Sequence, residues 1–268
     1  MSIPEIKKNI TSPIAEKYDT VVMNITGLFF KERVTKDMDL GLIGVINMMT
    51  EDSANIVKKY NGKLLCVTRT GISAMFGNNF DAALQCAITI SQDSELEERK
   101  SMFQGLGIGI DYGTICVGTV DHGGLHMPLV MSETTDTAVF LSNITQKYNS
   151  RILVTGSASA MMNDFQSRYN SRRLGKLYNT RTDSAIEIYD VYDGDIADTK
   201  YSKMRSRLFF ENGVDLFLKG SYLEARSYFI ELLKYDRNDA AAKQYVFKCD
   251  SCLSGTADEN EKNYLELR

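Results

Sequence analysis

Three glycines alternate with apolar residues in the stretch Gly105-Leu-Gly-Ile-Gly-Ile110, and this spacing constrains the fold more than any other feature of the sequence. A period of two is the period of a β-strand, so Gly105, Gly107 and Gly109 share one face. Glycine weakens a strand, so its repeated use on one face predicts that another element packs directly against it. A dinucleotide-binding fingerprint is excluded because the glycine spacing differs and no helix follows.

The segments around this strand alternate between strand and helix patterns. Residues 19–25 form a β-branched apolar run typical of a buried strand, and residues 37–60 carry apolar positions at helical spacing. A turn at Asn61-Gly62 leads into a hairpin over residues 63–76. The other predicted elements are a helix over 81–91, a second hairpin that turns at 111–113, a helix over 132–148, a strand over 152–155, a short helix over 157–163, and strands over 172–177 and 186–192. This β-α-β-β-α-β order with additions predicts a ferredoxin-like α+β fold with an antiparallel-rich central sheet.

The alternation of strands and helices stops after Asp195. Three amphipathic helices are predicted beyond it, over residues 205–218, 222–235 and 239–253. We therefore expect three parts: an α+β domain over 1–196, an all-α helical-hairpin extension over 200–255, and a polar, frayed tail over 256–268.

The charge balance and the cysteine content exclude several classes of protein. The 31 Lys and Arg residues against 35 Asp and Glu residues give a net charge of -4, which argues against a nucleic-acid-binding protein. The longest apolar runs reach about half of the roughly 20 residues that a membrane-spanning helix needs, so we expect no membrane span. The cysteine count of 5 is odd, and no signal peptide is visible, so we expect a cytoplasmic protein in a reducing compartment.

Two groups of charged or ligand-type residues have a plain interpretation. Arg172, Arg173 and Arg181 offer an anion patch, but a solvated charged edge is the simpler interpretation. The two histidines and the lone Cys-x-x-Cys pair have too few ligand-type neighbours in the sequence for a metal site. We therefore expect no metal ligands among them.

Several short motifs follow one another in a fixed order between residues 17 and 192. Asn-Ile-Thr-Gly-Leu occupies residues 24–28, Ala-Met-Phe-Gly occupies 74–77, and Ile-Gly-Ile-Asp-Tyr-Gly occupies 108–113. In this order the motifs resemble those of the class III adenylate and guanylate cyclase catalytic domain. The resemblance covers the whole domain and implies the nucleotide cyclase fold.

The resemblance also implies a reaction for which this chain lacks the charged groups. Family members are understood to act as head-to-tail dimers in which two Asp carboxylates hold two Mg²⁺ ions, and the ions activate the ribose 3′-hydroxyl for attack on the α-phosphorus. Those two positions fall on Asn24 and Thr70 in this sequence. Hard divalent cations prefer anionic oxygen ligands, and neither residue supplies a charge.

The nucleotide-pocket positions of the family are replaced as well. The base-reading Lys or Glu falls on Cys66, and its partner falls on Pro128. The Asn and Arg that steady the ribose and the phosphorus fall on Thr135 and Val139, and the late Lys falls on Thr180. The resemblance therefore implies a pseudoenzyme with no catalytic residues and no cofactor. The alternative is a divergent cyclase in which Asn24 and Thr70 are weak ligands of Mg²⁺ or Mn²⁺.

The helical extension resembles a single tetratricopeptide repeat, with matches at Gly213, Gly220, Tyr222, Ala225, Phe229 and Leu232. One repeat cannot bury its apolar face alone. We therefore expect the extension to dock on the preceding domain, to pair with another chain, or to bind a protein partner. The docking residues that we expect are Tyr222, Phe229 and Leu232.

The sequence thus favours an inactive cyclase-homology module that regulates or senses a ligand. We expect it to form a homodimer or heterodimer through the cyclase-like domain and to bind a protein partner through its C-terminal helices. Two alternatives remain open: a divergent cyclase that makes cAMP or cGMP, and a scaffold whose helical surface binds peptides.

Overall fold

A mixed sheet forms the centre of the computed structural model. The structure describes residues 15–27, 40–68, 71–95, 105–122, 125–180, 182–257 and 262–267. Within these ranges it does not describe the side chains of residues 40–49, 68, 120–128 and 266–267. The sheet has 9 strands in the order β2-β3-β1-β4-β6-β8-β7-β9, with β5 paired to β4 off this path. The strands are β1 (Ala15–Thr26), β2 (Lys63–Thr68), β3 (Gly71–Met75), β4 (Gly107–His122), β5 (Leu125–Met131), β6 (Ile152–Thr155), β7 (Ser171–Asn179), β8 (Ser184–Val191) and β9 (Glu266–Leu267).

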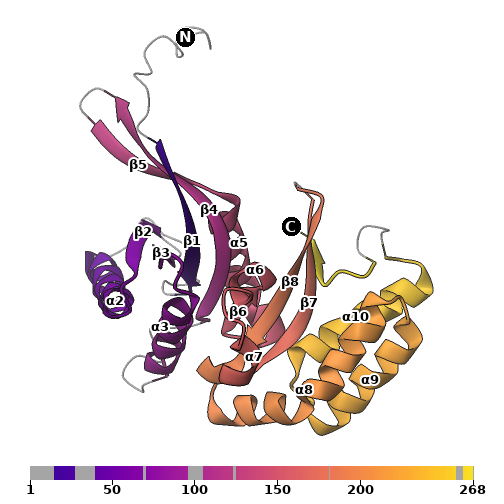
Figure 1. Ribbon diagram of the computed structural model, residues 1–268. Coiled ribbons are helices and arrows are strands. Elements are labelled where there is room, and N and C mark those ends of the chain that lie inside the picture. The colour runs from indigo at the N-terminus through magenta and orange to yellow at the C-terminus, as the bar shows by residue number, and fades with distance from the viewer. Residues whose placement is uncertain are drawn as a thin grey trace.

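Helices flank the sheet and extend beyond its β7 side (Figure 1). They are α2 (Leu40–Lys59), α3 (Phe80–Asp93), α5 (Glu133–Ile144), α6 (Gly156–Ser159), α7 (Phe165–Arg168), α8 (Ala197–Leu218), α9 (Tyr222–Tyr235) and α10 (Ala240–Ser254), with the 3₁₀ turns η2 (Thr145–Tyr148) and η3 (Tyr192–Gly194). None of the helices in the described ranges is long and apolar enough to cross a bilayer. The predicted α+β class and the antiparallel-rich sheet are confirmed, because among the described strands only β4–β6 and β7–β9 pair in parallel.

The two faces of β1 serve different purposes. Val21, Met23 and Ile25 are fully buried in a core that also contains apolar side chains of β4 and α3. Helix α3 begins where the side chain of Asn79 accepts a hydrogen bond from the backbone N–H of Ala82. Because side chains alternate along a strand, the even-numbered residues of β1 face the opposite layer, where α5 lies.

The glycine face of β4 lies directly under α5, as the sequence predicts. A Cβ at Gly107 would lie 2.2 Å from the carbonyl oxygen of Ser142, and one at Gly109 would lie 2.1 Å from that of Ala138. Gly105 precedes the strand and has a φ of 78°, so it serves the turn rather than the packing face. Only glycine leaves room for the backbone of α5 at this distance.

Strand β4 continues through the turn that we expected at residues 111–113, so that prediction is wrong. Asp111 is buried in the strand, where it accepts hydrogen bonds from Thr155 Oγ1 at 2.6 Å and Ser157 Oγ at 2.8 Å. Gly113 pairs with Thr20 of β1. The chain instead returns as β5, and the far halves of β4 and β5 project from the sheet as a two-stranded arm (Figure 1).

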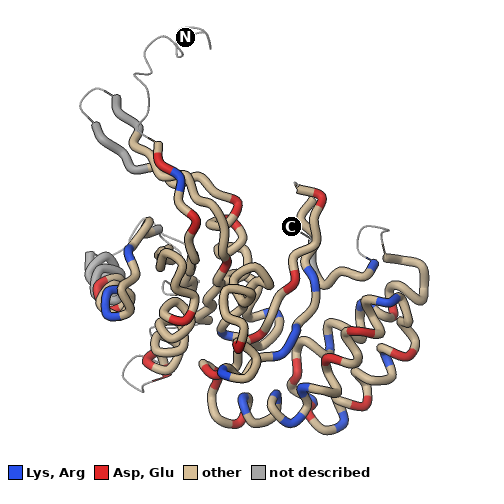
Figure 2. Tube along the Cα trace, in the orientation of Figure 1, with Lys and Arg blue, Asp and Glu red and all other residues tan. Residues whose placement is uncertain are grey.

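The three C-terminal helices pack on the β7 side of the sheet. Their apolar residues form one cluster with Leu174 and Leu177 of β7 and with Ile188 of β8. Tyr245 of α10 donates a hydrogen bond from its hydroxyl to the carbonyl oxygen of Leu174 at 2.7 Å. Of the three arrangements expected for the extension, docking on the preceding domain is therefore present. Figure 2 shows acidic and basic residues interspersed over these helices.

The end of the chain is ordered between residues 262 and 267, so the expectation of a frayed tail is wrong there. Leu265 is fully buried, and its backbone N–H donates to the carbonyl oxygen of Lys176 at 2.7 Å. The ring of Tyr264 packs against that of Tyr178, with 4.9 Å between the ring centroids. This segment pairs in parallel with β7 and covers the edge of the sheet.

Candidate functional site

Asn24 lies in the middle of β1, on the face covered by α5, and only 4% of its surface is exposed. Its Nδ2 donates to Ser142 Oγ at 2.8 Å, and its Oδ1 accepts from Ser73 Oγ at 2.7 Å. Ser142 Oγ in turn donates to the carbonyl oxygen of Val139 at 2.8 Å. Both ends of the Asn24 amide are therefore engaged, and the residue ties β1 to β3 and to α5.

The strand register aligns several candidate positions across the sheet. Cys66 of β2 is opposite Ser73 of β3, which is opposite Asn24, which is opposite Gly109 of β4. Cys66 is exposed at the β2 end of this row. The sequence analysis missed the two serines, because their role depends on strand register and helix packing rather than on any motif.

Three of the other positions of the resemblance, Thr135, Val139 and Thr180, lie on α5 or near its start. Thr135 and Val139 are on α5, and the Thr135 hydroxyl oxygen is buried without a hydrogen-bond partner among the described residues. Thr180 is exposed next to Asn179, whose Nδ2 donates to Glu133 Oε1 at the start of α5, at 2.6 Å. The backbone of Pro128 pairs with Thr119, but its side chain lies outside the described residues, as does Thr70 altogether.

The residues around Asn24 do not fit the two-metal site of the cyclase reaction. The Asn24 amide directs an N–H group at Ser142, and its one oxygen already accepts a hydrogen bond. Within the part of the chain that the structure describes, no group of three or more His, Cys, Asp or Glu side chains could hold a metal ion. A divalent cation needs anionic oxygen ligands, which these side chains do not supply.

Replacing Asn24 by aspartate is expected to destabilise the protein by about 1–3 kcal/mol at neutral pH. The new carboxylate would be buried, and Ser142 would have to give up its bond to Val139 in order to donate to it. Burial raises the pKa of such a carboxyl, so the loss of stability should shrink as the pH falls toward 4. Thermal melts at the two pH values measure this change.

The matched control for this variant is Asn143→Asp, which makes the same chemical change at an exposed position of α5. The control should melt within about a degree or two of the wild type, since exposed substitutions change stability little. If Asn24→Asp melts as high as the wild type at neutral pH, the buried hydrogen-bonded position of residue 24 is contradicted.

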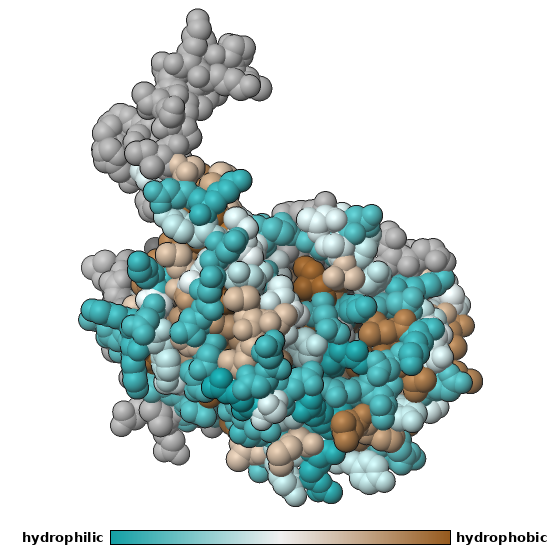
Figure 3. Space-filling view, in the orientation of Figure 1, coloured by the Kyte–Doolittle hydropathy of each residue, from teal (hydrophilic) through white to brown (hydrophobic). Residues whose placement is uncertain are grey.

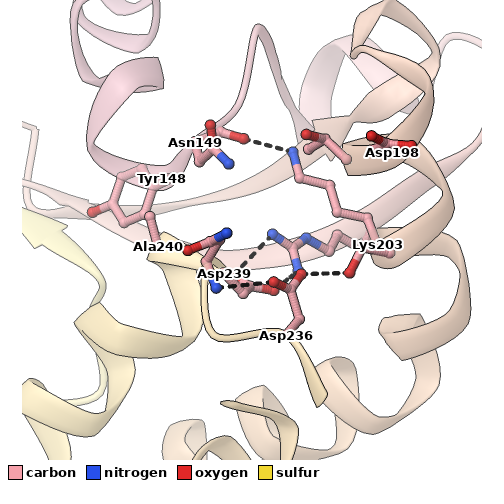
Figure 4. Close-up of a pocket in the computed structure, with 11 residues that line it drawn as sticks. Tyr148, Asn149, Asp198, Lys203, Asp236, Asp239 and Ala240 are labelled. Atoms are coloured by element: carbon pink, nitrogen blue, oxygen red, sulfur yellow. Dashed lines mark hydrogen bonds and ion pairs between the residues drawn. The ribbon is translucent and has the colours of Figure 1, made fainter. Parts of the chain in front are cut away.

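A second polar cluster joins the sheet to the C-terminal helices and borders a cavity of about 250 Å³ (Figure 4). Arg172 of β7 is fully buried and bonds Asp190 Oδ2 at 3.0 Å and Asp239 Oδ2 at 2.6 Å. Lys203 of α8 bonds Asp190 Oδ2 at 2.9 Å and Asp195 Oδ2 at 2.6 Å. The expectation that Arg172 belongs to a solvated edge is therefore wrong.

Burial and neighbouring charges shift the pKa values of Asp239 and Asp195 in opposite directions. Burial is the largest influence on Asp239 and would raise its pKa, but the Arg172 charge and hydrogen bonds hold the pKa below its usual range. Burial also dominates at Asp195, and it raises the pKa to about 6 against the opposing charge of Lys203. Asp195 is therefore the group whose protonation should respond to mildly acidic pH.

The raised pKa of Asp195 predicts a specific pH dependence of stability. A carboxyl with a higher pKa in the folded chain takes up a proton on folding, so its contribution to stability is full below about pH 4 and is lost as the pH rises through about 6. The stability of the wild type relative to Asp195→Asn should therefore fall over this range, by at most about 1.4 kcal/mol per pH unit. Urea unfolding at several pH values measures it, and a difference that is constant with pH would contradict the assignment.

The expected docking residues of the extension are not on its surface. Phe229 is fully buried and Leu232 is 2% exposed, both within the cluster shared with the sheet. Tyr222 is partly buried and donates a hydrogen bond from its hydroxyl to Asn263 Oδ1 at 2.8 Å. These side chains hold the helices together in the chain itself, so a partner would have to contact other residues.

Known sequences match only part of this chain. No protein-family model matches the chain. Over 143 residues, or 53% of this chain, the sequence is 27% identical to "Adenylate cyclase, terminal-differentiation specific" of Dictyostelium discoideum. The match spans 7% of that protein, so the chain corresponds to a small part of it.

Solved cyclase structures match a larger share of this chain than the sequence comparison does. A bacterial light-regulated adenylyl cyclase has a TM-score of 0.54 at 16% identity, covering 73% of this chain and 57% of its own. The adenylyl cyclase CyaB from P. aeruginosa has a TM-score of 0.53 at 17% identity, and the match covers 66% of this chain and 95% of CyaB. The guanylyl cyclase Cya2 has a TM-score of 0.52 at 16% identity, and the match covers 66% of this chain and 93% of Cya2. The chain therefore contains the α+β fold of the class III adenylyl and guanylyl cyclase catalytic domain, followed by three helices that pack together.

Proposed function

We propose that the chain is a cyclase-homology module that has lost the cyclase reaction and acts as a regulatory or ligand-sensing partner. The observation that carries the proposal is the environment of Asn24, whose amide is buried and hydrogen-bonded at both ends. In the cyclase family that the chain resembles, a metal-binding aspartate occupies this position. In this chain Asn24 occupies it, and its amide stabilises the fold instead.

The size of the electrostatic loss favours an inactive protein over a slow enzyme. Removing one preorganised group that stabilises transition-state charge typically costs about 10²–10³ in rate, although such losses do not multiply. At the metal positions, Asn24 and Thr70 are both neutral. At the ribose and phosphate positions, Thr135 and Val139 are neutral as well, so no charged group of the resemblance remains to stabilise the transferring phosphorus.

The cyclase-like domain offers apolar surface for a dimer, as homodimer or heterodimer. On β1, Tyr18 is 43% exposed, and on β5, Leu129 and Met131 are 42% and 59% exposed. Leu129 and Met131 pair with Gly118 and Cys116 of β4 and share one face of the sheet beside the projecting arm, whereas Tyr18 pairs with Ile115 and lies on the opposite face. Exposed apolar side chains that gather on one part of a surface favour contact with another protein.

We propose further that helices α8 and α9 form a tetratricopeptide-like hairpin whose role is docking. A Cβ at Gly213 would lie 2.9 Å from the Phe229 ring, so the small residue allows the two helices to approach closely. The ring of Tyr222 packs against Phe217, with 5.5 Å between the centroids. These contacts support the resemblance of this hairpin to one repeat.

A divergent cyclase is the second candidate function. It is favoured by the 27% identity to a Dictyostelium protein named as an adenylate cyclase. Titration calorimetry with ATP and GTP, each with and without Mg²⁺ or Mn²⁺, separates the two. We expect no metal-dependent nucleotide binding, whereas tight binding that requires the metal ion would favour the cyclase.

A further inference from the structure

A groove with aromatic walls is lined by residues of helices α8 and α9 and by Asp236, which follows α9. It encloses about 490 Å³, and its wall includes the rings of Tyr201, Phe209 and Tyr235. Leu232, which is only 2% exposed, also borders it. Figure 3 shows apolar side chains scattered among hydrophilic ones over these helices.

The apolar side chains at this groove continue along the exposed face of α8. Tyr201, Met204 and Leu208 follow at positions i, i+3 and i+7, and they are 57%, 48% and 74% exposed. Tyr235 at the end of α9 is 85% exposed. A stripe at helical spacing usually faces a core, but this one faces solvent. It is accordingly a surface that could be covered by another protein.

The charges around the groove indicate what kind of partner would cover it. The groove meets the cavity of Figure 4 at Ser202 and Asp236, which line both. Asp198 lines that cavity and is exposed on the first turn of α8. Among the described residues neither Asp198 nor Asp236 forms an ion pair, whereas the cations of that cavity, Arg172 and Lys203, are buried in ion pairs of their own.

The groove also has a ring that already holds a cation. The guanidinium of Arg205 lies over the ring of Tyr201, 5.6 Å from its centroid. Aromatic faces attract lysine and arginine side chains, and carboxylates that form no ion pair add to this attraction. Of the two such carboxylates, Asp198 and Asp236, the latter accepts hydrogen bonds from Ser202 Oγ and from the backbone N–H of Asn238. Glu231 of the groove is paired with Lys234, and Arg205 brings its own positive charge to the Tyr201 ring, so a partner's cation is drawn toward Asp198 and Asp236 rather than to that ring.

We propose that this groove binds a peptide segment of a partner protein in which an apolar side chain stands beside a lysine or arginine. The apolar side chain lies between Tyr201, Phe209 and Tyr235, and the cation lies toward Asp236 and Asp198. The inference rests on the proposed docking role of the C-terminal helices, and it names the chemistry of the partner.

Fluorescence anisotropy of the full chain with labelled peptides tests this inference. The probe is a ten-residue peptide of alternating Leu and Lys, compared with one of Leu and Glu and one of Ser and Lys. We expect Leu–Lys to bind with a Kd at least about tenfold below the other two. Tyr235→Ala should weaken this binding about fivefold, as expected for the loss of about 1 kcal/mol of ring contact. Asp198→Lys should also weaken it.

Two matched controls keep the test independent of folding. Phe247→Ala removes an aromatic ring that is 69% exposed on α10, and Glu224→Lys reverses an exposed charge on α9. Both should leave the Leu–Lys affinity unchanged. Equal binding in Tyr235→Ala, or equal or tighter binding of Leu–Glu, would overturn the inference.

The same titrations separate this inference from the proposed function. If Leu–Glu binds and Tyr235→Ala abolishes that binding, the docking role stands and the inferred partner chemistry is wrong. If none of the three peptides binds, both the inference and the docking role of the helices fail. The loss of cyclase chemistry is tested separately by the nucleotide titrations and is unaffected by either result.

Discussion

Replacing Arg172 by methionine is expected to destabilise the protein by about 3–5 kcal/mol, because it leaves buried carboxylates without their partner. Arg172 and Asp190 are fully buried, and Asp239 is 4% exposed. The guanidinium also lies over the Phe210 ring, 4.2 Å from its centroid, which methionine replaces only in part. After the substitution, Lys203 is the one remaining cation bonded to Asp190 in the described structure. Urea unfolding followed by circular dichroism measures the loss.

Arg168→Met is the matched control, because Arg168 pairs with Asp81 at 3.0 Å where both side chains are 40% exposed or more. Exposed ion pairs contribute about 0–1 kcal/mol, so this variant should remain close to the wild type. Similar unfolding midpoints for the two variants would contradict the buried position of Arg172 and its role in joining β7 to the turn before α10.

Truncation after Ile196 is expected to leave a protein that aggregates or binds hydrophobic dyes strongly. The C-terminal helices cover Leu174, Leu177 and Ile188, which are fully buried in the full-length chain. Truncation also removes Asp239 and Lys203, so Arg172 and Asp190 are uncovered together with the apolar face. Size-exclusion chromatography with light scattering and dye fluorescence compare the two proteins.

The separated helices, residues 200–268, should be largely unfolded by circular dichroism, because short helices gain most of their stability from tertiary packing. A soluble, monodisperse truncated domain would contradict the shared core. A cooperative melt of the helical fragment that does not depend on its concentration would instead make the helices a domain of their own.

Local patterns in the sequence predicted most of the fold, because burial alternates with the period of each element. The strand at residues 19–25 and the helix at 81–91 were found from this periodicity, and both extend by a few residues as β1 and α3. The glycine face of β4 correctly predicted the close contact with α5. The turn at 111–113 was wrong because Asp111 and Gly113 favour turns locally, whereas contacts with Thr155 and β1 keep the strand extended.

Long-range contacts decide what the sequence could not reveal. Arg172 is an ordinary surface residue by type, and its partners lie 18 and 67 residues away in the sequence. Leu265 stands in a polar stretch, and its burial depends on the edge of β7. Phe229 and Leu232 were expected to meet a partner, but both are buried in the cluster that the three helices share with β7 and β8, where the Phe229 ring packs against Phe210 of α8 and Tyr245 of α10.

At the candidate site, residue types were predictable and their surroundings were not. The neutral side chains of Asn24 and Cys66 are read from the sequence alone. The hydrogen bond from Asn24 to Ser142 joins residues 118 apart, and it becomes visible only when α5 is packed on β1. That contact gives the Asn24 amide a structural role between β1 and α5.

The most direct test of the proposed function is a cyclase assay on the purified full chain, with ATP and GTP and with Mg²⁺ or Mn²⁺. We expect no time-dependent cAMP or cGMP above the protein-free background, because Asn24 and Thr70 supply no metal-binding charge. The double variant Asn24→Asp, Thr70→Asp should be equally inactive, since Cys66, Pro128, Thr135 and Val139 still lack the groups that support the base and the phosphorus. Cyclic nucleotide formation by the wild type that survives repurification, and that disappears in a folded Asn24→Ala variant, would contradict the account.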